Sequence, residues 1–526
     1  MESFWQMVTR SEAGAPADAA QARRVADALA NAAAVEVYVE SVVAEGGALY
    51  AMARQGDEKV LLTAWPKGHT PSAADTLEGN RRPLDLGVAS AEAVLAPRSA
   101  DNAAAVRRLL PWTGPQPVAG RPSVGLGDRL GLATPGHVRA VRGTGYVPML
   151  AQQSIREMTR TGRSPRDVMD DATWGVVQTG FRDGFGADAD HLKSPADIDA
   201  CTEAGFTFYT IDPGDHVDNA ADTMDASALA EAFDALPWDA LASAPSDARA
   251  AAAKAAVDLA DGRRLALQEP TLVRAAVKYG RAVAHTAAMY RHLADRLGEG
   301  GFELEVSVDE TDSPTTPEQH LYVASELARL GVAWVSLAPR LVGRFEKGVD
   351  YIGDLADLER TFVEHLAIAR ALGGYKISLH SGSDKFSVYR MAARHGGERV
   401  HVKTAGTSYL EALRVLADRE PALFREILGF ARDRYETDKA TYHVSADVAK
   451  VPPPDDLADA DLSALLDDFD ARQVLHVTYG SVLTAEDGER FRSRLLDALR
   501  AHESAYEAAL ARHIGRHLEP FVEAVG

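Results

Sequence analysis

The chain has 526 residues, of which 46% are hydrophobic, so it can bury a large core without a disulfide or a structural metal. Its 77 acidic and 56 basic residues give a net charge of −21, which disfavours nonspecific binding to nucleic acid or to an anionic membrane. Its one cysteine, Cys201, excludes an intramolecular disulfide. The first residues lack the continuous apolar stretch of a secretion signal. We therefore expect a cytoplasmic protein that does not enter a membrane.

Residues 1–115 are predicted to form a small N-terminal α+β domain. The alanine-rich segment 19–33 predicts a helix, and the alternating valines of 35–39, with the apolar run 60–62, predict short strands. The proline-rich segment 111–117 cannot continue a helix or a central strand, so we place the linker there.

The larger domain, residues 116–526, contains eight short apolar runs, each ending in polar residues and followed by a helical pattern. The runs, our predicted strands, are 123–127, 185–189, 206–212, 303–309, 333–338, 375–380, 400–404 and 474–478. Alternating strands and helices imply parallel pairing, and eight such units fit a closed barrel better than an open doubly wound sheet. The predicted fold class is therefore α/β, a (β/α)8 TIM-type barrel, with helical insertions at about 215–300, after the third predicted strand, and at about 408–440, between the seventh and eighth.

Two of the intervening helices have clear predicted boundaries. Ser194 and Pro195 begin one that Gly205 ends, and Thr316 begins another that ends near Gly331.

Polar residues gather after the predicted strands, where a barrel of this type forms its active site. Glu310, His380 and His476 follow three different strands, and a carboxylate with two imidazoles suits Zn²⁺, Mn²⁺, Co²⁺, Ni²⁺ or Fe²⁺. Asp190 and His191 are a reserve pair of ligands. The alternative for each histidine is a hydrogen-bonded core residue.

The glycine-rich segment 125–131 resembles a dinucleotide loop only superficially. Its third glycine is one position late, and Asp128 would repel a pyrophosphate. We therefore reject nucleotide binding there and expect no nicotinamide cofactor.

Several other strand-end residues are suited to binding a small polar substrate. The loop 381–385 offers the hydroxyls of Ser381 and Ser383 and the charges of Asp384 and its neighbouring lysine. Four cations also follow strands, and their alternative role is that of solvated surface charges: Arg129, Lys193, Arg340 and Lys403. An arginine among them would hold a carboxylate through two parallel hydrogen bonds.

Six of these segments together resemble one family. They are 127–131, 187–193, 310–315, 336–340, 376–387 and 403–407. The chain, from about residue 120 to its C-terminus, resembles the tagaturonate epimerases. The resemblance implies interconversion of D-tagaturonate and D-fructuronate with a divalent metal.

The resemblance also suggests roles for the matching residues. Glu310, His380 and His476 would hold the metal, and Asp128 or Asp190 would move the hydroxyl proton. Lys403 would stabilise oxyanion charge, and Arg129 or Arg340 would bind the carboxylate. The remaining expected substrate contacts are His191, Lys193, Ser381, Ser383 and Asp384.

The reaction itself narrows the mechanism. The inverted carbon lies two atoms from the ketone, so the carbonyl does not acidify its hydrogen and enolisation cannot invert it. Transient oxidation and retro-aldol cleavage remain, and the missing nicotinamide fingerprint favours the second.

Two rival functions stay open. The first is a ketohexose 4-epimerase acting on neutral tagatose and fructose, whose substrates differ from the hexuronates only in having CH₂OH in place of the carboxylate. A non-catalytic sugar-binding barrel is disfavoured, because so many ionisable groups at one end of a barrel are costly without chemistry. We expect a small-molecule partner and no nucleic acid or membrane, and the sequence leaves a homo-oligomer open.

Overall fold

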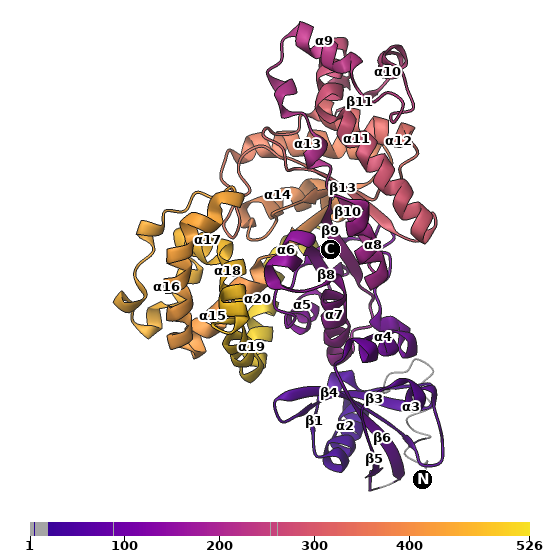
Figure 1. Ribbon diagram of the computed structural model, residues 1–526, viewed down its shortest axis with the longest axis vertical. Coiled ribbons are helices and arrows are strands. Elements are labelled where there is room, and N and C mark those ends of the chain that lie inside the picture. The colour runs from indigo at the N-terminus through magenta and orange to yellow at the C-terminus, as the bar shows by residue number, and fades with distance from the viewer. Residues whose placement is uncertain (1–4, 6–18, 88, 253, 260, 526) are drawn as a thin grey trace.

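The computed structural model describes residue 5 and residues 19–525 except 88, 253 and 260 (Figure 1). At its N-terminal end, helix α2 (Ala19–Ala33) occupies the predicted position. An antiparallel sheet follows in the order β1-β3-β4-β6-β5, with β2 paired to β3. Its strands are β1 (Glu36–Val37), β2 (Val43–Glu45), β3 (Ala48–Gln55), β4 (Glu58–Pro66), β5 (Asn80–Asp85) and β6 (Ser90–Pro97).

The two faces of this sheet bury different partners. Leu49 and Leu62 pack with Leu29 of α2 on one face. On the other face, Leu61 packs with Val106 of α4 (Ala100–Leu109) and with Trp174 of α7 (Pro165–Thr179). Side chains alternate between the faces of a strand, so each face has its own apolar cluster, and the second cluster attaches the sheet to the barrel.

Eight parallel strands form a closed barrel in the order β10-β13-β14-β15-β16-β7-β8-β9, which confirms the predicted fold class. They are β7 (Ser123–Leu126), β8 (Val147–Ser154), β9 (Gly186–Leu192), β10 (Phe208–Ile211), β13 (Glu303–Val308), β14 (Ser336–Pro339), β15 (Lys376–Leu379) and β16 (Val400–Thr404). The barrel closes where β16 pairs with β7, and there Lys403 lies opposite Gly125.

Seven of the eight predicted strands are confirmed and one is wrong. The run 474–478 lies in and just after helix α17 (Phe469–Val477), whose first turn is capped by Asp468. This helix is buried almost all round, so its apolar run has no helical period to reveal it. The missing strand is β8, whose eight side chains are all buried even though its second half is polar.

The missed strand changes the number of barrel strands that precede each insertion. The first follows β10, the fourth barrel strand, and contains α9 (Ala226–Asp234), α10 (Pro245–Ala252), the hairpin β11 (Ala256–Asp258) and β12 (Arg264–Ala266), and α11 (Glu269–Leu297). In Figure 1 it lies at the top, far from the N-terminal sheet. The second insertion follows the last barrel strand, β16, rather than preceding an eighth one.

The other helices lie beside the N-terminal sheet, surround the barrel or form a C-terminal group. They are α3 (Ser72–Thr76), α5 (Thr134–Val141), α6 (Ile155–Thr161), α8 (Pro195–Ala204), α12 (Pro317–Arg329), α13 (Leu355–Ala371), α14 (Phe386–Gly396), α15 (Thr407–Arg419), α16 (Pro421–Asp438), α18 (Tyr479–Thr484), α19 (Arg492–Ala501) and α20 (Glu503–Val525). The predicted helix starts at Ser194 and Thr316 are confirmed as capping boxes, and Gly205 ends α8 with φ 88°. Helix α20 packs along α5, α14 and α15. Within the described residues, no helix combines the length and apolar character needed to span a bilayer.

Candidate active site

The C-terminal ends of the barrel strands surround a cavity of about 490 Å³, which we call the barrel mouth. Residues from seven strands or the loops that follow them reach into it, including Asp190, Asp309, Arg340, His380 and Lys403. This is the end of the barrel at which parallel α/β barrels place their chemistry.

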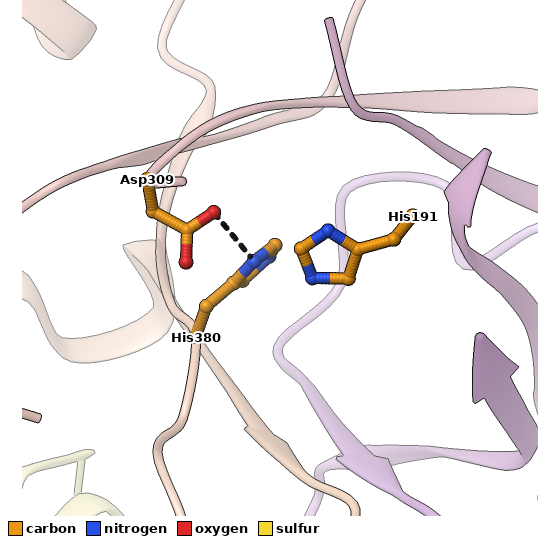
Figure 2. Close-up of side chains that lie close together, drawn as sticks. All are labelled: His191, Asp309 and His380. Atoms are coloured by element: carbon orange, nitrogen blue, oxygen red, sulfur yellow. Dashed lines mark ion pairs between the residues drawn. The ribbon is translucent and has the colours of Figure 1, made fainter. Parts of the chain in front are cut away.

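Three side chains of the barrel mouth converge as a candidate metal centre. His191, Asp309 and His380 point toward one another (Figure 2), and each offers one ligand atom within 4.8 Å of the others. Nδ1 of His380 lies 3.3 Å from an Asp309 carboxylate oxygen. Two imidazoles and one carboxylate are a suitable donor set for a divalent transition metal, and three protein ligands leave positions open for a substrate.

Each imidazole also has a carboxylate on its other nitrogen. Nδ1 of His191 lies 3.2 Å from Asp212, and Nε2 of His380 lies 2.6 Å from Glu305. His191 therefore keeps Nε2, and His380 keeps Nδ1, as a ligand atom. Nδ1 of His380 is buried and has no hydrogen-bond partner among the described residues. Carboxylates on the second nitrogen orient metal-binding histidines, so this arrangement fits an ion.

Beside this group, Lys403 lies in a buried cluster of carboxylates. Its Nζ is 2.7 Å from Asp188, 2.7 Å from Asp190 and 2.8 Å from Glu305, and it donates to Thr210 Oγ1 at 2.6 Å. Burial opposes its charge, but the three carboxylates raise the pKa of Lys403 well above its usual value.

The carboxylates of this cluster differ in their protonation. Burial would raise the pKa of Asp190, but Lys403 lowers it well below its usual range, so Asp190 is ionised. Burial raises the pKa of Asp188 to about 7 in spite of the same ammonium group. Asp190 lines the barrel mouth and Asp188 does not. Asp190 is thus the member of the pair that can exchange a proton with a substrate.

The structure does not bring Glu310 and His476 together with His380. Glu310 is partly exposed, its side chain faces Arg156 at 3.5 Å, and it forms a separate candidate ligand group with His191 and Asp212. His476 belongs to α17 and lines the cavity, but it is in none of the candidate ligand groups formed by the described residues. Burial lowers its pKa well below the usual value, and the nearby Arg129 lowers it further, so His476 is neutral.

Asp128, a predicted proton carrier, is occupied by the backbone. One of its oxygens accepts from the amides of Leu130 and Gly131, and the other accepts from Ala133. It does not line the barrel mouth. Its carboxylate therefore orders the loop after β7.

Arg129 and Lys193 already pair with carboxylates of the protein. Arg129 donates to Glu157 at 2.7 Å and stacks over the Tyr479 ring at 3.7 Å. Lys193 is partly exposed, lies 3.1 Å from Asp215 and does not line the cavity.

Asp384 lies behind the cavity, in a second group of possible ligands with His513 and His517. Its carboxylate contacts His513 at 2.5 Å and Arg472 at 2.9 Å, and its amide donates to Nε2 of His517 at 3.0 Å. The arginine charge and the occupied imidazole disfavour a cation, so we read this group as a structural network. The other predicted substrate contacts, Arg340, Ser381 and Ser383, line the barrel mouth.

Sequence reasoning missed the acids Asp188, Asp212, Glu305 and Asp309. For Asp188 and Glu305, the sequence contained a pattern that could have identified them. Asp188 and Asp190, and likewise Glu303 and Glu305, are two residues apart in strands whose other residues are mostly apolar. Such spacing places both side chains of a pair on one face of the strand, here the interior of the barrel.

Comparison with known proteins gives consistent matches over nearly the whole chain. A family model described as tagaturonate epimerase matches residues 38–521. A tagaturonate/fructuronate epimerase of Thermotoga maritima is 43% identical over 484 residues, which are 92% of this chain and 96% of that protein. The native crystal structure of fructuronate-tagaturonate epimerase UxaE from Cohnella laeviribosi is 37% identical with a TM-score of 0.86, covering 95% of this chain and 99% of that one. The same enzyme complexed with one glycerol matches equally well.

Proposed function

Because this chain belongs to the tagaturonate epimerase family, we propose that its barrel mouth interconverts D-tagaturonate and D-fructuronate with a divalent metal ion held by His191, Asp309 and His380. The chain is an isomerase acting on small sugar acids. The observation that carries the metal proposal is the pair of histidines that each commit one nitrogen to a carboxylate and direct the other toward Asp309 and the cavity.

The reaction needs a route that does not remove the hydrogen of the inverted carbon. That carbon is β to the ketone, and its hydrogen is not acidic. Its hydroxyl proton is removable, and loss of this proton allows the bond to the adjacent carbon, α to the ketone, to break. We therefore propose retro-aldol cleavage followed by aldol addition.

A divalent ion in this site would polarise the ketone oxygen and stabilise the negative charge that develops there. Asp190 accepts the hydroxyl proton, because it is ionised and lines the cavity. Lys403 holds Asp190 in place through a 2.7 Å hydrogen bond.

The steps balance without an external reagent. As Asp190 takes the proton, the carbon–carbon bond breaks and its electron pair passes to the ketone-bearing fragment. The other fragment becomes an aldehyde, which rotates and presents its opposite face. The bond forms again, Asp190 returns the proton, and the carbon is inverted.

The test is a metal reconstitution experiment. The protein is treated with a chelator, reloaded with single metals and assayed by NMR on tagaturonate, fructuronate, tagatose and fructose. We expect the chelated protein to be inactive and at least one metal to restore turnover of the two hexuronates. Full activity in protein shown by plasma emission to be metal-free would contradict the metal proposal. Turnover of only the neutral ketohexoses would contradict the proposed substrate.

A further inference from the structure

Two cations of the barrel mouth, Lys347 and Arg340, form no ion pair with a carboxylate of the described residues. The cavity is lined by Arg129, Arg156, Arg340, Arg344 and Lys347. Three of the arginines face glutamates: Arg129 pairs with Glu157, Arg156 with Glu310 and Arg344 with Glu346. Nζ of Lys347 instead donates to Ser381 Oγ at 2.8 Å, and no carboxylate of the described residues forms an ion pair with it.

The position of Lys347 relates it to the metal group. Its hydrogen-bond acceptor, Ser381, directly follows the candidate ligand His380 and has a positive φ of 49°. The ammonium group therefore lies in the lining of the cavity, hydrogen-bonded to the residue that follows a candidate ligand.

The loop that carries Lys347 is fixed by buried hydrogen bonds. Nζ of Lys385 donates to the carbonyls of Glu346 at 2.8 Å and Val349 at 2.6 Å, on either side of Lys347. Lys385 itself is buried and is therefore part of the framework.

A second anchor holds the next residue of the loop. Arg472 donates to the carbonyl of Gly348 at 2.6 Å and pairs with Asp384 at 2.9 Å. His513 of the C-terminal helix α20 contacts the same Asp384 at 2.5 Å. The network behind the cavity thus fixes the backbone of Lys347, so little ordering remains to be done when a ligand binds.

We propose that Lys347 donates a charge-assisted hydrogen bond to the carboxylate of the hexuronate and so selects a sugar acid over a neutral ketohexose. This inference rests on the proposed function. An ammonium whose hydrogen bond within the described residues goes to a hydroxyl gains an ion pair from a carboxylate, and no such gain from a CH₂OH group at the same place.

The surrounding charges support this reading. Burial lowers the pKa of Lys347; Glu157 and Asp309 act in the opposite direction, and the cations of Arg156 and Arg129 lower it further. A bound carboxylate would relieve that repulsion. The cavity is lined by six Asp or Glu and six Lys or Arg side chains, but Glu157, Glu310 and Glu346 are paired with arginines, and no acid of the described residues is paired with Lys347.

Arg340 is the other candidate for binding the substrate carboxylate, and it provides a matched control. It also lines the cavity, and no carboxylate of the described residues forms an ion pair with it. Its backbone pairs with Thr315, just before α12, and no hydrogen bond of the described residues joins it to Lys347 or Ser381. Arg340→Gln removes one positive charge from the same cavity without touching the Lys347 site.

The test compares Lys347→Met, Lys347→Arg and Arg340→Gln with the wild type. We expect Lys347→Met to lower kcat/KM on tagaturonate and fructuronate by about 10- to 100-fold, as for a lost charge-assisted hydrogen bond, and to change it less than about threefold on tagatose and fructose. Lys347→Arg should recover part of the loss. Arg340→Gln should not reproduce the selectivity change.

A binding measurement separates this inference from the proposed function. We expect Lys347→Met to weaken binding of a six-carbon aldonate by about 10- to 100-fold and binding of the corresponding alditol by less than about threefold. Metal content and thermal midpoint confirm that the variant is folded and loaded. Equal losses for both ligands, no loss for either, or the selective loss in Arg340→Gln instead would overturn the assignment. Failure of the wild type to turn over hexuronates would refute the proposed function, and the aldonate and alditol data would still decide the role of Lys347.

Discussion

Replacing Lys403 by methionine tests the charge balance inside the barrel. The ammonium group has three carboxylates within 2.8 Å, those of Asp188, Asp190 and Glu305, and the lysine is almost fully buried. Methionine has a similar length but neither the charge nor the donors. The change leaves three acids in a low-dielectric interior without the ammonium group that they share, and this lowers the free energy of unfolding.

The expected loss of stability is large for a single substitution. Breaking a buried ion pair costs about 3–5 kcal/mol, because the remaining charge is uncompensated. A chain of 526 residues has an unfolding entropy of roughly 1.1 kcal/mol per kelvin, so each kcal/mol corresponds to about 1 °C. We therefore expect the calorimetric midpoint to fall by about 3–5 °C at pH 7.

The loss should depend on pH in a defined direction. Without Lys403, the pKa of Asp188, which burial already raises to about 7, rises further, and Asp190 and Glu305 lose the ammonium that lowers theirs, so the folded variant binds more protons than the folded wild type. Its stability relative to wild type is then highest at low pH and is lost as the pH rises through the raised pKa values. The deficit relative to wild type should shrink between pH 8 and pH 6.

Two further variants isolate the cause. Adding Asp188→Asn to Lys403→Met removes one of the uncompensated acids and should recover about 1–3 °C. Lys193→Met makes the same chemical change at a partly exposed pair and should cost about 1 °C or less. A wild-type midpoint in Lys403→Met, or a deficit that grows as the pH falls, would refute the reasoning.

Three other outcomes are expected. His380→Ala should fold but contain no metal when measured by plasma emission. The control His401→Ala, which removes a buried imidazole bonded to Ser123, should keep the metal. Wild-type metal stoichiometry in His380→Ala would exclude His380 as a ligand. Substrate deuterated at the inverted carbon should keep its label through many turnovers in H₂O by NMR, whereas an oxidative route would give a primary isotope effect of about 3, equivalent to about 0.65 kcal/mol. Burial lowers the pKa of His365 to about 4, so below about pH 6.5 the unfolded chain binds a proton that the folded chain does not, and this residue should cost about 1.4 kcal/mol of stability at pH 5.5. Urea unfolding at pH 7 and pH 5.5 should show a smaller acid loss in His365→Gln, and equal losses would contradict this account.

Local sequence signals were enough for most of the fold. The cap at Ser194 and the positive-φ glycine at Gly205 act within one turn of helix, so they predict the limits of α8 without knowledge of any distant contact. The alternation of apolar runs and helices likewise predicts parallel pairing and a barrel. The error at 474–478 arose where burial removes periodicity, since an all-buried helix and an all-buried strand have the same composition.

The chain's own sequence also determined the family, through the segments around Asp190, Glu310 and His380. It placed the chemistry at the strand ends, and the barrel mouth lies there. It did not determine which strand-end side chains meet. Asp309 and Glu310 are adjacent acids, yet Asp309 contacts His380 while Glu310 is exposed beside Arg156.

Only the tertiary structure decides such choices, because neighbouring side chains near a strand end point in different directions and the partners come from other strands. Lys347 is the clearest case. In the sequence it is one lysine in a polar loop, and its place at the cavity depends on Lys385 and Arg472 holding the backbone around it. Those contacts join residues from 36 to 124 positions apart, a separation over which no local pattern carries information.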